Sequence, residues 1–189
     1  MKIGIRLLSI LFLLVLLCGI TRGDIISNSI VAKTGQVFVY CVGDDGYYQK
    51  GIAWTNNDRF VVGAGTASNC VTDRLTQLMW LKNPDTITRT WTNAISYCEN
   101  LDGTNGRGGY TDWRLPNRRE LFSLIDDGTD NPALPTNHPF TNMQANRYWT
   151  STTCEPSSET AWGVIFINGY MFNNAKTFSY YVLPVRAGQ

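Results

Sequence analysis

The spacing of apolar residues predicts two short helices near the middle of the chain. Apolar side chains recur at helical intervals across residues 91–101, and Thr90 stands where an N-cap is expected. A second helix should begin after Asn117, which can cap it while Glu120 returns a hydrogen bond to the cap in a capping box. The apolar residues that follow share one helix face: Leu121, Leu124 and Ile125.

Alternation of apolar and polar residues predicts strands on both sides of these helices. A hairpin is expected over residues 70–72 and 76–81, with Leu78 and Trp80 buried on one face. Pro184 predicts that the last strand lies at a sheet edge or carries a bulge. The downstream strands are expected at 147–152, 162–167, 170–172 and 180–186, with a polar loop at 153–160. The pattern therefore predicts an α+β fold with two short helices and antiparallel sheets.

The N-terminal part predicts a small β-rich element at residues 24–65, packed on a main domain at residues 66–189. Three short strands are expected in the smaller element, with a turn between the first two. Those strands fall at 36–42, 47–54 and 59–62, and the turn at 43–46.

Residues 1–23 have the pattern of a secretory signal. Lys2 and Arg6 precede a leucine-rich run that is too short for a bilayer, and small residues lead to a possible cleavage after Gly23. Cys18 leaves lipid modification as an alternative. We expect a product with no transmembrane span that is secreted, periplasmic or held at the cell surface.

Removal of that segment changes the net charge. Three of the 16 basic residues and none of the 15 acidic residues would be lost, which leaves 13 against 15 and a charge of about −2 instead of +1. Such a chain has no net positive charge to attract nucleic acid or an anionic membrane. We therefore expect no nucleic-acid partner.

Four cysteines remain after cleavage. In an oxidising compartment an even number predicts two disulfides, and three connectivities are open. We favour Cys41–Cys70 and Cys98–Cys154. A zinc site is disfavoured because the chain has no C-x-x-C pair and only one histidine, His138.

Asp112, Trp113 and Arg114 stand just before the second helix. A large ring flanked by opposite charges predicts a corner locked by an ion pair, with Arg114 in a buried or half-buried pair. Strand alternation places Trp149 and Trp162 in the same core. The other residues expected to be structural are Asn117, Glu120 and Arg186.

A loop rich in side-chain oxygens follows the second helix. Asp126, Asp127 and Asp130 could bind calcium, but a calcium site needs six to eight oxygens, and Asx turns explain the composition equally well. Asp44 and Asp45 are likewise interpreted as a solvated turn. We therefore expect no metal and no other cofactor.

The sequence holds no recognisable catalytic constellation. No serine lies in a nucleophile elbow, and His138 is the only histidine that could serve as a base. Glu120 and Asp126 could be nominated as a glycosidase pair, but Glu120 is already assigned to the helix cap. We expect no enzymatic activity.

An ordered series of sequence blocks carries a resemblance to a known family. TDRLTQLMWLK, TWTNAISYCENL, TDWRLPNRREL, RYWTSTT and YYVLPVR resemble the family named after the C-terminal domain of the collagen-like bacterial adhesin Lcl. More distantly, the order of the two helices and the closing V-R strand is similar to C-type-lectin-like and formylglycine-generating-enzyme folds. The resemblance implies a C-type-lectin-like domain.

The resemblance also implies a non-catalytic binding or adhesion module. It implies recognition of extracellular glycans, sulfated glycosaminoglycans among them, or of a protein partner, and a trimeric assembly. The enzymatic chemistry of the distant relatives is not implied, because no cysteine follows Cys154. Two alternatives stay open: an extracytoplasmic enzyme or accessory subunit of unknown reaction, and a structural envelope module.

Basic residues around the second helix are the candidates for binding a sulfated glycan. Arg107, Arg118 and Arg119 are the ligand candidates, because the planar guanidinium suits sulfate as it suits phosphate. The alternative is that they are ordinary solvated charges.

Overall fold

The computed structural model of the protein describes residues 31–52, 59–105 and 107–187. The expected secretory segment at 1–23, which includes Cys18, lies outside these residues. Within them, no helix combines the length and apolar content that crossing a membrane requires.

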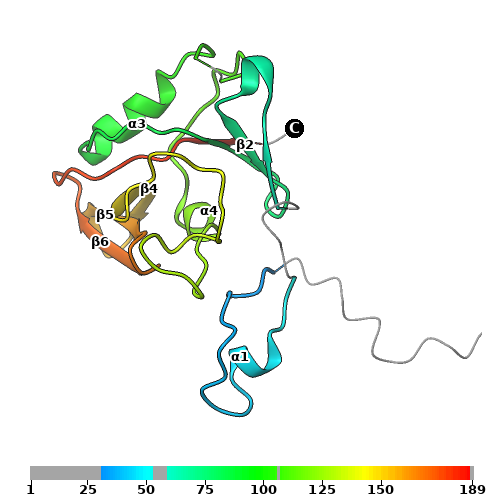
Figure 1. Ribbon diagram of the computed structural model, residues 1–189. Helices are drawn as coiled ribbons and strands as arrows, with labels where there is room; N and C mark the ends of the chain where they lie inside the picture. Colours follow the sequence, from blue (N-terminus) through cyan, green and yellow to red (C-terminus); the bar gives the residue numbers. More distant parts are fainter. Residues whose placement is uncertain (1–30, 53–58, 106, 188–189) are drawn as a thin grey trace, which may run out of the picture.

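The domain is built from two antiparallel sheets and a few helices (Figure 1). One sheet has the strand order β1-β2-β3-β7 and the other the order β4-β5-β6. The predicted α+β class with antiparallel sheets is confirmed. The strands are β1 (Phe60–Val62), β2 (Cys70–Asp73), β3 (Leu78–Leu81), β4 (Arg147–Cys154), β5 (Ser157–Ile165), β6 (Met171–Ala175) and β7 (Val185–Ala187).

Both predicted central helices are present. Thr90 occupies the N-cap of the first without a side-chain hydrogen bond, so its capping role is not seen. Asn117 caps the second by accepting from the N–H groups of Arg119 and Glu120, and Glu120 accepts from the Asn117 N–H at 2.8 Å. The predicted capping box is confirmed. These helices are α3 (Trp91–Glu99) and α4 (Arg118–Phe122).

The first hairpin follows the prediction, whereas the closing strand predicted at 180–186 is shorter and covers only Val185–Ala187. β2 pairs with β3 from Cys70 opposite Leu81 to Asp73 opposite Leu78. β3 also pairs with β7, so the closing strand lies at the sheet edge, as Pro184 predicts.

The polar loop predicted at residues 153–160 is wrong. β4 continues to Cys154 and β5 begins at Ser157, so this segment is a hairpin whose register shifts after Trp149. Its side chains are polar on both faces, so no apolar alternation marks it as strand.

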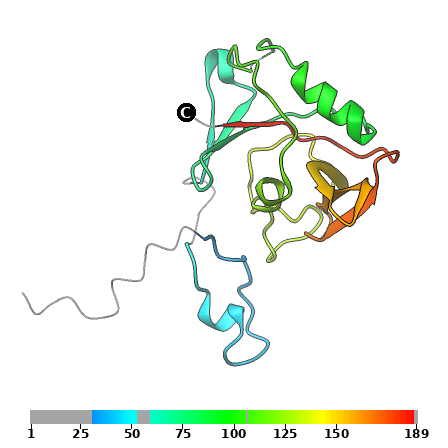
Figure 2. The same ribbon diagram turned by 180° about the vertical axis from the view of Figure 1, so that it is seen from behind.

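The main core lies between the two sheets. Trp80 of β3, Leu121 of α4, Tyr148 of β4 and Val164 of β5 are each at most 1% exposed and pack in one cluster. α4 accordingly lies between the sheets in both views (Figures 1 and 2). A second cluster, which includes Cys98, joins α3 to the three-stranded sheet.

The described N-terminal residues are less β-rich than predicted. Residues 31–52 contain the helix α1 (Asp45–Tyr48) and one isolated bridge between Ala32 and Ile52, so the strand predicted at 36–42 is absent. Asp44 causes this difference. Its carboxylate caps α1 and accepts from the N–H groups of the preceding loop, which holds the loop away from an extended path. The strand predicted at 59–62 is present as β1.

Candidate functional site

Arg114 forms an ion pair, but its partner is Glu120 and not Asp112. Two guanidinium nitrogens donate to the two carboxylate oxygens at 2.8 and 2.7 Å, with the Arg114 side chain 44% exposed. Burial raises the pKa of Glu120, but the hydrogen bonds from Arg114 and from the Asn117 N–H outweigh it, and the pKa is lowered. One ionised carboxylate therefore completes both the pair and the capping box.

Asp112 pairs with Arg186 from the closing strand. The Arg186 Nε lies 2.7 Å from one carboxylate oxygen, and this hydrogen bond holds the pKa of Asp112 below its usual range. The ring of Tyr110 lies 3.8 Å from the guanidinium. The two charges that flank Trp113 are thus each bound to a residue outside the Asp-Trp-Arg triplet.

The three tryptophans expected in the core differ in burial. Trp113 and Trp149 are 2% and 0% exposed. Trp162 is only half-buried, which corrects its assignment to the core. The Arg118 guanidinium lies 4.6 Å above its ring. Trp162 of β5 therefore faces α4, where a charged side chain covers it in place of apolar packing.

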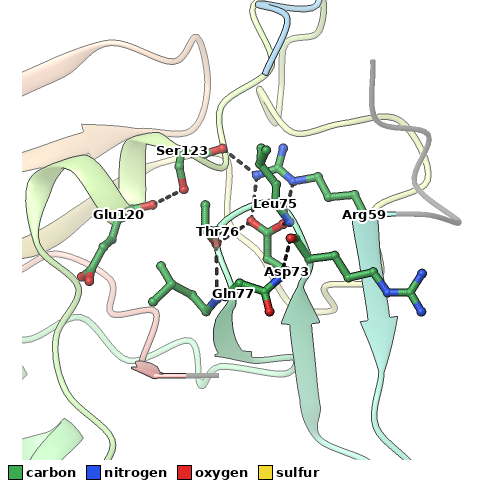
Figure 3. A network of polar contacts seen from close by, with 9 residues as sticks. Arg59, Asp73, Leu75, Thr76, Gln77, Glu120 and Ser123 are labelled. Carbon is green, nitrogen blue, oxygen red and sulfur yellow. Dashed lines mark hydrogen bonds and ion pairs between the residues drawn. The ribbon is translucent and has the colours of Figure 1, made fainter. Parts of the chain in front are cut away.

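A buried polar network joins β1, the β2–β3 turn and the end of α4 (Figure 3). Arg59 donates to both carboxylate oxygens of Asp73 at 3.0 and 2.9 Å and to the Ser123 carbonyl at 2.6 Å. Asp73 also accepts from the Leu75 N–H and the Thr76 hydroxyl. The sequence prediction missed this network, although an Asp at the start of a turn was visible in it.

A groove of about 670 Å³ lies beside this network. Three segments line it: the N-terminal residues 31–34, the turn and start of β3, and α4 with the residues after it. Leu75, Thr76 and Ser123 belong to both the network and the groove, so the buried ion pair holds two of the walls together. The apolar lining residues are Val31, Ala32, Leu75, Leu78, Phe122 and Ile125.

The arginines nominated as ligand candidates do not form one patch. Arg107 lies beyond α3 and donates to Asp102 at 2.6 Å. Arg118 and Arg119 begin α4, where Arg119 is exposed and lines the groove. Neither of these two pairs with a carboxylate in the described part of the chain, whereas five other arginines do: Arg59, Arg89, Arg107, Arg114 and Arg186.

No disulfide joins the cysteines that the structure describes, which corrects both predicted bridges. Cys41 is exposed in the segment before α1, which lies at the opposite end of the molecule from β2, the strand begun by Cys70 (Figures 1 and 2). A bridge needs Cα atoms within about 7 Å. Cys98 packs with Trp149 in a cluster that excludes Cys154, and burial raises the pKa of its thiol to about 12.

The aspartates nominated for calcium do not converge on a metal site. No three acidic, His or Cys side chains in residues 31–52, 59–105 and 107–187 are placed to hold an ion together. Asp126 accepts from the Gly128 N–H at 2.8 Å, as in an Asx turn, and Asp130 is exposed. Desolvation, aided by the charges of Asp126 and Asp45, raises the pKa of Asp127.

The comparison with known families covers two of the three segments that line the groove. The model of the Lcl C-terminal domain matches residues 69–186, which run from the start of β2 into β7 and include both helices and the groove-lining Arg119. No curated protein matches the chain. Because the family match spans more than half of the sequence, the chain belongs to the Lcl C-terminal domain family.

Proposed function

We propose that this protein is a non-catalytic extracytoplasmic binding module that recognises anionic glycans, sulfated glycosaminoglycans among them, at the groove beside α4. One observation carries the proposal: Arg118 and Arg119 are consecutive and have no carboxylate partner in the described residues, and Arg119 lines a groove of about 670 Å³. A groove of this volume is of the size that small ligands occupy.

The charges favour an anionic ligand. A sulfate that binds Arg118 or Arg119 displaces no protein carboxylate, so the guanidinium loses only water. Lys33 lines the groove as a third cation, and Glu120 is neutralised by Arg114. Asp127 is the opposing charge, and its pKa is raised by burial first and then by the charges of Asp126 and Asp45. The apolar walls can contact the C–H faces of sugar rings.

The stacking of Arg118 on Trp162 supports the same interpretation. The contact holds the long side chain over one ring face, so less rotamer entropy is lost when a ligand binds. The Arg118 N–H also donates to the Thr152 hydroxyl at 3.0 Å, which ties the start of α4 to β4. A positioned cation of this kind differs from an ordinary solvated charge.

The finer fold assignment and the cellular site belong to the same proposal. Pairing of the closing strand β7 with β3 brings the two ends of the family region together, which supports a C-type-lectin-like arrangement. The signal-like residues 1–23 support export to the periplasm, the medium or the cell surface. A trimer, which the family resemblance implies, would offer three grooves to one polymer and raise its avidity.

Binding of heparin to the purified protein tests the proposal. At about 50 mM salt, Arg118→Glu with Arg119→Glu should weaken binding at least tenfold, because attraction becomes repulsion. The charge-matched control, Lys82→Glu with Arg147→Glu, changes two basic residues that do not line the groove and should stay within about twofold. Equal binding by wild type and the Arg118/Arg119 variant, or no binding by wild type, would rule out this site.

A further inference from the structure

A second hollow lies between the outer face of α3 and the loop that follows it. Its volume is about 520 Å³. α3 lies at the outside of the molecule in both views (Figures 1 and 2). The hollow is open to solvent. Six of its eight lining residues are polar: Asn93, Ser96 and Asn100 from the helix, and Asp102, Asn105 and Arg107 from the segment after it.

Several of these polar groups are not used by the fold. The side chains of Asn93, Ser96 and Asn105 make no hydrogen bond within the described residues. Asn100 uses its amide nitrogen to donate to the Ser96 carbonyl at 2.7 Å, which leaves its side-chain oxygen as an acceptor. The hollow therefore presents both donors and acceptors, because a carboxamide carries one of each kind.

Among the described residues, the two charged side chains that line the hollow neutralise each other. Arg107 donates to Asp102 Oδ1 at 2.6 Å, and the same oxygen accepts from the Thr104 hydroxyl at 2.6 Å. The ion pair holds the Arg107 guanidinium in place, and only 17% of this side chain is exposed. Its remaining N–H groups therefore point in defined directions. Asp102 Oδ2 accepts no hydrogen bond in the described structure and stays available.

A neutral ligand rich in hydroxyl groups suits this lining better than an ion does. A hydroxyl donates one hydrogen bond and accepts others, so adjacent hydroxyls can be bound by a carboxamide, a carboxylate and a guanidinium together. Asp102 would repel an anion, and Arg107 would repel a cation. Tyr97 and Leu101 add apolar surface, of the kind that the C–H face of a sugar can contact.

From this arrangement we propose that the α3 hollow binds a neutral saccharide. The site is separate from the groove beside α4 and uses no residue of it, so it does not depend on the proposed recognition of anionic glycans. The open form of the hollow favours one or two sugar units laid against the helix, with affinity supplied by hydrogen bonds.

The test is a titration of the full protein with cellobiose, maltose and N,N′-diacetylchitobiose, followed by backbone amide chemical shifts. At about 20 mM sugar, which exceeds a millimolar Kd, at least one disaccharide should shift the amides of residues 93–107. Asn93→Ala with Ser96→Ala should weaken that binding at least fivefold. Alanine is the best helix former, so this variant should remain folded.

Two controls keep the result decisive. Asn173→Ala removes an exposed carboxamide on β6, away from the hollow, and should leave the titration unchanged. Arg118→Glu with Arg119→Glu should weaken heparin binding at least tenfold without affecting the disaccharide, so the two sites can fail independently. The proposal is overturned if no disaccharide shifts residues 93–107, or if the Asn93/Ser96 variant binds as well as wild type.

Discussion

Asp73 is fully buried and is bound through both carboxylate oxygens by Arg59, at 3.0 and 2.9 Å. The pair joins β1 to β2, and the Arg59 bond to the Ser123 carbonyl carries the link to the end of α4. The buried ion pair therefore adds to the β1–β2 strand pairing that holds the family region and the preceding strand together. The same contact supports two walls of the α4 groove.

Replacing Asp73 by alanine should destabilise the fold by about 3–5 kcal/mol, because it leaves the Arg59 charge buried without a partner. The Thr76 hydroxyl and the Leu75 N–H would also lose their acceptor. Urea unfolding measures the change. Asp85→Ala is the control: Asp85 pairs with Arg89 but is 32% exposed, so its loss should amount to about 1 kcal/mol or less. If the two variants lost similar amounts of unfolding free energy, burial of the Arg59–Asp73 pair would not increase its contribution to stability.

The capping box should make stability depend on pH in the acid range. Because the folded-state pKa of Glu120 is lowered, its ionised form adds stability above the unfolded value of about 4.3. That contribution is lost as the pH falls through the lower folded-state pKa. Glu120→Gln should therefore be less stable than wild type by about 1 kcal/mol at neutral pH. Melting temperatures measured from pH 7 downward should converge in acid, and a gap that widens in acid would contradict this account.

Thiol reactivity should separate the cysteines by burial. Cys41 is exposed and should react with Ellman's reagent in the folded protein. Cys98 should react only after unfolding, because the thiolate is the reactive form and burial raises the pKa of this thiol to about 12. Peptide mapping of the labelled sites checks the assignment. Rapid labelling of Cys98 in the native protein would mean that the cluster beneath α3 opens readily.

Local signals in the sequence were sufficient for the elements around α4. The capping box depends on residues three apart, and the β2–β3 hairpin on alternation within one segment, so both could be predicted. Ion-pair partners could not be predicted in the same way. Arg186 reaches Asp112 from 74 residues away, and only the folded chain determines that contact.

The partners of the cysteines and of the arginines could not be predicted for a related reason. An even number of cysteines says nothing about where Cys41 lies relative to Cys70, and a bridge is decided by that distance. Arg107 is close in sequence to Arg118 and Arg119, yet it is neutralised by Asp102 in a different part of the surface. Whether an arginine keeps its charge available depends on its partner, which its position in the sequence does not reveal.

The most direct measurement of the central claim is the position at which a sulfated oligosaccharide binds. A heparin-derived tetrasaccharide should be titrated into the protein while backbone amide shifts are recorded. The account predicts the largest shifts at Arg118, Arg119 and Lys33, around the α4 groove, with weaker binding as salt rises because added ions screen these exposed charges. Shifts that instead gather on the 153–160 hairpin, and leave α4 unchanged, would contradict it.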